Sequence, residues 1–144
     1  MKIIIAAVLF CFFSFAQATE FVREQGFEVQ IQPFPSTFLT REVAGLHGFE
    51  RSRRQALINV VVLNIQPDGQ ARGAVSAEVT GFSKNLLGQI QTLNFKEVDE
   101  GRGAIYYLAP VRVSSEEEIQ IALQVLPENA QAIDIKFKHR VYVD

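Results

Sequence analysis

The stretch that decides the fold of this chain is Ala56-Leu-Ile-Asn-Val-Val-Val-Leu-Asn-Ile65. It is rich in β-branched and apolar residues and contains neither proline nor glycine, so it predicts a β-strand. Apolar residues occupy both alternating faces, a pattern typical of a central strand that is covered on both sides. We therefore expect a sheet organised around a strand from Gln55 to Ile65.

Shorter segments in which polar and apolar residues alternate flank this strand, with turn residues between them. Seven short strands separated by such turns predict an all-β fold, an antiparallel immunoglobulin-like β-sandwich, with a small barrel as the alternative. Pro33 and Pro35 are expected to end the first strand, and Pro110 to mark an edge or a bulge. The strands are expected at about 27–31, 55–65, 71–82, 89–98, 104–113, 119–125 and 133–143.

The N-terminal segment has the pattern of a secretory signal peptide. Lys2 precedes an apolar run from Ile3 to Phe13, and Ala16 and Ala18 place small residues before a cut site. We expect cleavage after Ala18, a single mature domain over residues 19–144 and a periplasmic location. The apolar run is too short for a membrane span, although an uncleaved anchor is the alternative.

Composition limits the partners and the chemistry of the mature chain. Loss of Lys2 leaves 13 basic residues against 16 acidic ones, a net charge of −3. This balance argues against nucleic acid or an anionic membrane as a dedicated partner. The single cysteine lies in the signal segment, so neither a disulfide nor a thiol nucleophile is expected.

Several segments resemble a family of small exported bacterial proteins that is known only as a domain of unknown function. The resemblance covers nearly all of the mature chain and implies a periplasmic, immunoglobulin-like β-sandwich. It brings no activity and no catalytic or binding residues. The segments that carry it are Ser36-Thr-Phe-Leu39, Glu42-Val-Ala44, Arg51-Ser52, Leu57-Ile-Asn-Val60, Asn85-Leu-Leu-Gly-Gln89, Ala104-Ile-Tyr-Tyr107 and Val141-Tyr-Val-Asp144.

The long connection from Phe34 to Arg54 is the best candidate for a binding surface, because long connections in compact domains are often functional. Thr40 is a good N-cap for a short helix from Arg41 to about Leu46, which Gly45 or Gly48 would close. Basic and aromatic side chains in this segment suit a carboxylate, a phosphate or a partner chain. The alternative is a lid that caps the sandwich. The candidate binding residues are Phe38, Arg41, His47, Arg51, Arg53 and Arg54.

Other polar groups have structural explanations that we prefer. His139 shares a strand face with Phe137 and Val141, which favours a neutral core histidine over a metal ligand. The face carrying Lys136, Lys138 and Arg140 is expected to be solvated or to protect an edge strand. The run of glutamates at 116–118 lacks the ligand spacing of a calcium loop.

No catalytic motif and no cofactor signature occurs in the sequence. We therefore expect a non-enzymatic interaction module that contacts another envelope protein through the 34–54 connection or a strand edge. The alternative is a small-molecule carrier or enzyme whose site gathers Glu42, His47 and Arg51 into one pocket.

Overall fold

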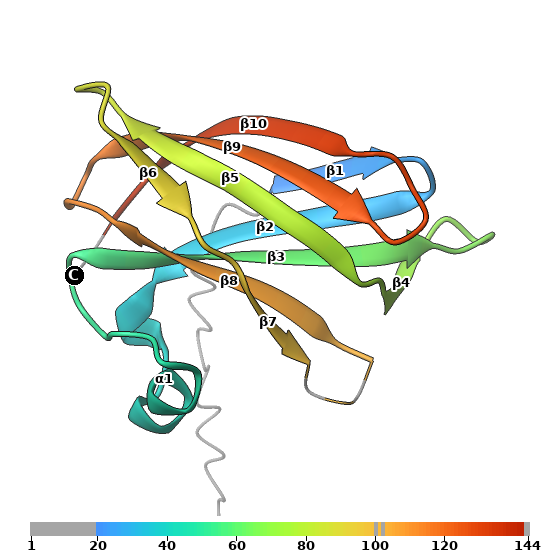
Figure 1. Cartoon of the computed structure of the whole chain (residues 1–144), viewed down its shortest axis with the longest axis horizontal. Helices are drawn as coiled ribbons and strands as arrows, with labels where there is room; N and C mark the ends of the chain where they lie inside the picture. Colours follow the sequence, from blue (N-terminus) through green and yellow to red (C-terminus); the bar gives the residue numbers. More distant parts are fainter. Residues whose placement is uncertain (1–19, 100, 102, 143–144) are drawn as a thin grey trace, which may run out of the picture.

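The computed structural model describes residues 20–99, 101 and 103–142, and it shows two antiparallel β-sheets packed face to face (Figure 1). The larger sheet has the order β1-β2-β3-β8-β7, with β4 paired to β3, and the smaller has the order β10-β9-β5-β6. The strands are β1 (Glu20–Glu24), β2 (Phe27–Pro35), β3 (Gln55–Ile65), β4 (Ala71–Ala74), β5 (Ala77–Asn85), β6 (Ile90–Leu93), β7 (Lys96–Asp99), β8 (Ile105–Arg112), β9 (Glu118–Pro127) and β10 (Ile133–Arg140).

The central position predicted for residues 55–65 is confirmed. β3 pairs with β2 along one side and with β8 and β4 along the other. Its alternate residues Ile58, Val60 and Val62 join the core between the sheets. Leu57, on the opposite face, is also fully buried. Both faces of this strand therefore need cover, as its two-sided apolar pattern indicates.

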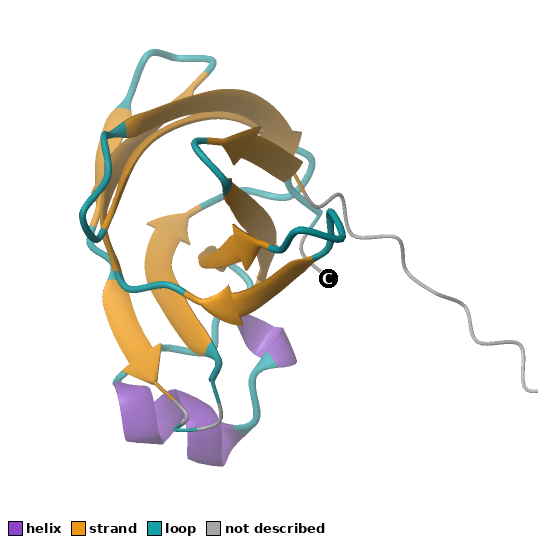
Figure 2. Cartoon of the chain, turned by 90° about the vertical axis from the view of Figure 1, so that its right-hand side faces the viewer, coloured by secondary structure: helices purple, strands orange, loops and turns teal. Residues whose placement is uncertain are grey.

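The sheets curve around a shared interior, as the end-on view in Figure 2 shows, and apolar side chains of both sheets fill it. β3 contributes to this interior from the larger sheet, and Ile121 and Val125 of β9 and Ile133 of β10 contribute from the smaller one. The helical segments lie outside this interior. An all-β sandwich is thus the correct fold class.

The number of strands differs from the prediction: the described part of the chain contains ten, not seven. The predicted strands 71–82 and 89–98 are each two strands, and in both cases the chain crosses from one sheet to the other between them. Alternation of polar and apolar residues continues through such a crossing, so periodicity does not reveal it. The strand β1 was missed; it forms a hairpin with β2 through Gln25 and Gly26, both at positive φ.

Pro33 lies inside β2 and does not end it, contrary to the expectation, whereas Pro35 is the last residue of that strand, as predicted. Among the described residues the pairing of β1 with β2 stops at Ile31, so Pro33 has a paired neighbour in β3 but none in the described part of β1. Pro110 lies in β8 beyond the last residue paired with β7, and Pro127 lies in β9 beyond the last residue paired with β10. A proline is tolerated where a strand has no neighbour on one side.

Two side chains connect the sheets at their edges. The amide of Gln91 in β6 pairs with the backbone of Arg112 in β8, donating to its carbonyl and accepting from its N–H, both at 2.8 Å. The hydroxyl of Tyr107 accepts from the N–H of Ala77 at 2.9 Å and lies 3.1 Å from a carboxylate oxygen of Glu97. These bonds fix how one sheet sits on the other.

Two short helical segments fill the connection between β2 and β3: a 3₁₀ turn, η1 (Ser36–Phe38), and the helix α1 (Arg41–His47). The predicted helix and its caps are confirmed, with Thr40 at the N-terminus and Gly48 at the C-terminus. None of the helices in the described ranges has the length and apolar character that a membrane crossing requires. The expected signal peptide lies outside the described residues.

A glycine in the middle of β5 marks a close approach between strands. Gly81 pairs with Leu93 of β6 and Leu123 of β9. A Cβ atom at this position would collide with the carbonyl oxygen of Ala122 and would lie 2.7 Å from Cδ2 of Leu123. The smaller sheet therefore requires a residue without a side chain here.

We predict that Gly81→Ala lowers the free energy of unfolding by about 1–3 kcal/mol, the usual cost of overpacking. The matched control is Gly45→Ala in α1, where no atom lies within 4 Å of the added methyl group. That change should be neutral or slightly stabilising, because alanine is the better helix former. Urea denaturation measures both, and equal effects of the two substitutions would contradict the packing argument.

Candidate functional site

The 34–54 connection is fastened to itself by a buried serine. The hydroxyl of Ser36, which is fully buried, accepts from the N–H of Ser52 and donates to the carbonyl of Ser52, both at 2.9 Å. These two bonds join the start of the connection to its end. The 3₁₀ turn also contacts β3, so the connection is anchored against the larger sheet.

Arg51 holds the middle of the connection. Its Nε donates to the carbonyl of Leu39 at 2.6 Å, and its Nη2 donates to the carbonyl of Thr37 at 3.2 Å. A guanidinium can serve two acceptors in this way because its donors form a rigid planar fork. The Arg51 side chain therefore stabilises the conformation of the segment, although it is exposed to solvent.

The helix α1 is capped at both ends. The hydroxyl of Thr40 accepts from the N–H of Val43 at 3.2 Å, and Gly48 adopts a left-handed conformation with φ of 73°. Lys96 of β7 reaches across to donate to the carbonyl of His47 at 2.6 Å. A cation at the C-terminus of a helix also interacts favourably with its dipole. The ends of this short helix are thus fixed by hydrogen bonds.

This fixed segment exposes large apolar side chains. Phe38 is 63% exposed and Leu46 is 77% exposed, and Val43, one turn before Leu46 on the same helix face, is also exposed. Ala44 on the opposite face is buried. We call Phe38, Val43 and Leu46 the lid patch. These exposed side chains do not cap the sandwich, so they do not fit the alternative of a lid that covers it.

The predicted binding residues of this connection differ in what their side chains do. Arg41, Arg53 and Arg54 are exposed, and no hydrogen bond or ion pair of their side chains to another described residue is present. His47 is half-buried. The connection that carries the lid patch thus also carries three exposed arginines without a described side-chain partner, whereas Arg51 is hydrogen-bonded within the segment.

The alternative site of Glu42, His47 and Arg51 gains no support. No hydrogen bond or ion pair joins these side chains within the described ranges. The two cavities described below are lined by other residues. In addition, no group of three or more His, Cys, Asp or Glu among the described residues could hold a metal ion.

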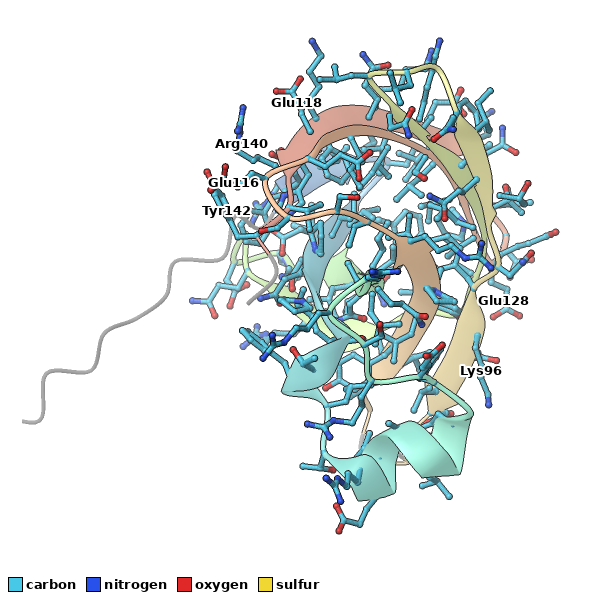
Figure 3. The ribbon with its side chains drawn as sticks, turned by 90° about the vertical axis from the view of Figure 1, so that its left-hand side faces the viewer. Lys96, Glu116, Glu118, Glu128, Arg140 and Tyr142 are labelled. Carbon is cyan, nitrogen blue, oxygen red and sulfur yellow. The ribbon has the colours of Figure 1, made fainter. Side chains whose placement is uncertain are left out.

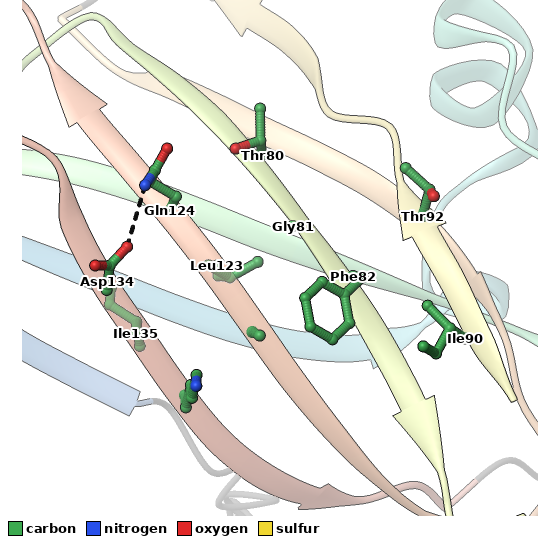
Figure 4. A pocket seen from close by; sticks show the side chains of 11 residues that line it. Thr80, Gly81, Phe82, Ile90, Thr92, Leu123, Gln124, Asp134 and Ile135 are labelled. Carbon is green, nitrogen blue, oxygen red and sulfur yellow. Dashed lines mark hydrogen bonds between the residues drawn. The ribbon is translucent and has the colours of Figure 1, made fainter. Parts of the chain in front are cut away.

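A shallow groove of about 720 Å³ runs over the outer face of the smaller sheet (Figure 4). Phe82 and Ile90 form its apolar part, and Gln124 donates to Asp134 at 3.2 Å in its polar part. The surface is hollowed here because Gly81 and Ala122 have little or no side chain. This groove could not be predicted from the sequence, since small residues in a strand have no distinctive period.

A second cavity of about 530 Å³ lies near the opposite end of β5 and has an acidic lining that includes Glu78, Glu97 and Glu128. The Tyr107 hydroxyl reaches this region, and its pKa is raised mainly by burial, with the Glu97 carboxylate adding to the effect. Figure 3 shows Glu128 and Lys96 on the opposite side of the sandwich from Glu116, Glu118 and Arg140. Because the hydroxyl already has two partners, it is a structural contact between the sheets.

The expectations for β10 are largely met. Lys136, Lys138 and Arg140 are exposed on the outer face, and among the described strands β10 pairs with β9 alone, so these residues follow an edge of the sheet as far as it is described. His139 is half-buried on the inner face, and burial lowers its pKa while the carboxylate of Glu20 acts in the opposite direction. The neutral form predicted for this histidine is therefore the favoured one.

Sequence reasoning missed one further surface, at the turn between β5 and β6. The sequence of residues 85–88 predicts only a turn between two strands, because asparagine and glycine are strong turn signals. The two leucines inside it are the most exposed large apolar residues in the described chain, Leu86 at 79% and Leu87 at 84%. Two adjacent leucines within a predicted turn are the feature of the sequence that indicates an exposed apolar surface here.

The comparisons with known proteins agree with this fold. The sequence profile of the domain of unknown function DUF4426 matches residues 22–144. A solved DUF4426 protein from Pseudomonas aeruginosa PAO1 is similar, with 32% identity and a TM-score of 0.76, covering 90% of this chain and 99% of that one. No curated protein sequence matches the chain significantly.

Two structures of FetP from uropathogenic Escherichia coli share the fold at low identity. A copper-bound variant of FetP is 10% identical with a TM-score of 0.62, covering 88% of this chain and 91% of that one. FetP as isolated is 11% identical with a TM-score of 0.61, covering 88% and 95%. At this identity the likeness concerns the fold alone.

We predict that Arg51→Ala lowers the free energy of unfolding by about 1 kcal/mol or more, because it leaves two carbonyls without their charged donor. Arg53→Ala is the matched control and should change stability by less than about 0.5 kcal/mol. Thermal and urea denaturation measure the difference. Equal stability of the two variants would show that Arg51 does not hold the connection.

We also predict that stability decreases as the pH falls below about 6.5, the ordinary pKa of histidine, because the folded chain resists protonation of His139. The unfolded chain binds that proton more readily, so the contribution is present above this pH and is lost below it. His139→Gln should reduce this slope, by at most about 1.4 kcal/mol per pH unit. His47→Gln is the control, and an unchanged slope in His139→Gln would contradict the assignment.

Proposed function

We propose that this chain, which belongs to the DUF4426 family, a domain of unknown function, is a non-enzymatic binding module that holds a partner protein against the lid patch. The observation that carries the proposal is the exposure of Phe38, Val43 and Leu46 on a segment whose backbone is fastened. A fixed surface loses little conformational entropy on binding, and this favours affinity. The module therefore presents a pre-formed contact surface.

The composition of the surface supports a protein partner. Aromatic residues and arginine are enriched at protein–protein interfaces, whereas lysine is depleted. The connection that carries the lid patch exposes Phe38 and also three arginines, Arg41, Arg53 and Arg54. The arginines would pair with carboxylates at the rim of the interface. We therefore expect the partner to offer an apolar pocket bordered by acidic side chains.

An enzymatic or metal-dependent role has less support. The sequence contains no catalytic motif, and the described residues bring together no cluster of metal ligands. The copper in the FetP variant belongs to a protein that is 10% identical, so it gives no ligand residues to this chain. Copper also prefers soft or imidazole ligands, and the proposed mature chain has two histidines and neither cysteine nor methionine.

The cell envelope is the compartment we propose for this activity. The support is the N-terminal pattern of one lysine, a short apolar run and small residues before a polar segment. Absence of cysteine from residues 19–144 means that the domain does not depend on the redox state of its surroundings. The partner would then be another envelope protein.

The test is crosslinking followed by affinity capture of the protein in a detergent-solubilised envelope fraction, in which contacts with the bilayer do not contribute. We predict that the double variant Phe38→Ser/Leu46→Ser loses at least tenfold of the captured partner, since truncating interface anchors commonly costs about 2 kcal/mol or more. Arg41→Glu/Arg53→Glu should reduce capture as well, through the partner's carboxylates. Stability should be unchanged, because all four side chains are exposed.

The matched control is Leu86→Ser/Leu87→Ser, which removes equally exposed leucines from a different surface. This variant should capture the partner normally. Capture that is insensitive to the Phe38/Leu46 change, or equally sensitive to both changes, would refute the lid patch as the contact surface.

A further inference from the structure

The turn between β5 and β6 is held rigid by one asparagine. The side-chain oxygen of Asn85 accepts from the N–H of Leu87 at 3.0 Å and from the N–H of Gln89 at 2.9 Å, and its amide donates to the Gln89 side chain at 2.8 Å. Gly88 closes the turn at φ of 81°. Leu86 and Leu87 are therefore presented in a fixed position at the end of the hairpin.

These leucines continue into an apolar strip on the outer face of the smaller sheet. Phe82 and Ile90 are both exposed there and line the apolar part of the groove shown in Figure 4. We call Phe82, Leu86, Leu87 and Ile90 the hairpin patch. It forms the projecting end of a hairpin, so it is convex where it is most apolar.

The strand register places three lysines on the same face. Lys84 is paired with Ile90 on one side and with Gln120 on the other, and Gln120 is paired with Lys138. In the next row, Phe82 is paired with Ala122, which is paired with Lys136. Directly paired residues in a sheet point to the same side. All three lysines are exposed, so their ammonium groups border the hairpin patch.

Acidic groups on this face gather toward its other end. Asp134 lies opposite Gln124, and Glu78 lies opposite Leu126, both farther from the turn than the lysines. Near the turn, the outward carboxylate of Glu118 lies opposite Arg140 in the register. Glu116 and Glu117 also lie at this end of the sheet, beside Val141. The four basic residues Lys84, Lys136, Lys138 and Arg140 therefore slightly outnumber the three glutamates at 116–118 there, although the mature chain as a whole carries a net charge of −3.

We propose that the β5–β6 hairpin docks on a lipid bilayer that carries anionic headgroups. Leu86 and Leu87 would enter the interfacial layer, while Lys84, Lys136 and Lys138 would lie against the headgroups. A projecting apolar tip needs no complementary pocket in a deformable phase, whereas a protein partner would have to supply one. Lysine is depleted at protein interfaces, but clustered lysines near apolar residues are typical of surfaces that bind anionic lipids.

The proposal is independent of the lid patch, because the two surfaces lie on opposite sides of the sandwich (Figures 1 and 3). Its test uses the absence of tryptophan from the chain. Leu87→Trp places a single fluorescent reporter in the turn, and Leu46→Trp places one in the lid patch as the control. Vesicles of phosphatidylcholine mixed with phosphatidylglycerol should shift the emission of the first reporter to the blue and leave the second unchanged.

Sedimentation with the same vesicles measures the affinity. Leu86→Ser/Leu87→Ser should lower the partition coefficient at least about tenfold, given the transfer free energy of a leucine side chain. Lys84→Glu/Lys138→Glu should lower it by about 25-fold or more, at about fivefold or more for each charge. Phe38→Ser/Leu46→Ser is the control and should bind like the unmodified protein. Intact-mass spectrometry of each variant verifies that all of them have the same N-terminus.

Three results would overturn the proposal. One is the absence of binding to either kind of vesicle. Another is binding without the predicted specificity: it persists in Leu86→Ser/Leu87→Ser, or it is as strong on vesicles of phosphatidylcholine alone as on the vesicles that contain phosphatidylglycerol. The third is self-association of the chain through the hairpin, without vesicle binding, in analytical ultracentrifugation. Since partner capture is measured separately, failure here leaves the proposed function of the lid patch standing.

Discussion

The requirement that both faces of β3 be buried determines much of this structure. Ile58 and Val60 point into the space between the sheets, and Leu57 points away from it, yet all three are fully buried. The smaller sheet covers the inner face. The 3₁₀ turn of the 34–54 connection also contacts β3. Burying one leucine contributes about 2 kcal/mol, so the burial of Leu57 on the outer face is a substantial part of what stabilises this strand.

The elements that could be predicted are those in which one local signal suffices. β3 was found with its correct ends because a two-sided apolar run has few interpretations, and α1 because Thr40 and Gly48 supply both caps. The sheet crossings near Val75 and Asn94 could not be predicted, because alternation is the same on either side of them. The expectation for Pro33 was wrong for a related reason: whether a proline breaks a strand depends on how far the neighbouring strand pairs with it, and that is a property of the sheet.

The candidate site could be predicted as a segment but not as a set of roles. The excess of arginine and aromatic residues in 34–54 was visible in the sequence. The distinction between Arg51 and Arg53 was not, since it depends on two carbonyls that only the folded loop directs at one guanidinium. The role of the hairpin leucines could not be predicted, because asparagine and glycine at 85 and 88 explain the turn whatever residues lie between them. Exposure, which decides whether a leucine can bind anything, depends on tertiary structure.

The two exposed apolar surfaces differ in chemistry, and this difference argues that they do not bind the same thing. The connection with the lid patch exposes an aromatic ring and arginines, whose planar donors favour acceptors in a fixed geometry, such as a carboxylate. The hairpin patch pairs leucines with lysines, whose flexible point charges suit an irregular array of anions. Because α1 and the β5–β6 turn project from opposite sides of the sandwich, neither occupant obstructs the other. A rigid β-sandwich between two such surfaces has the geometry needed to hold a protein partner at a fixed distance from a bilayer.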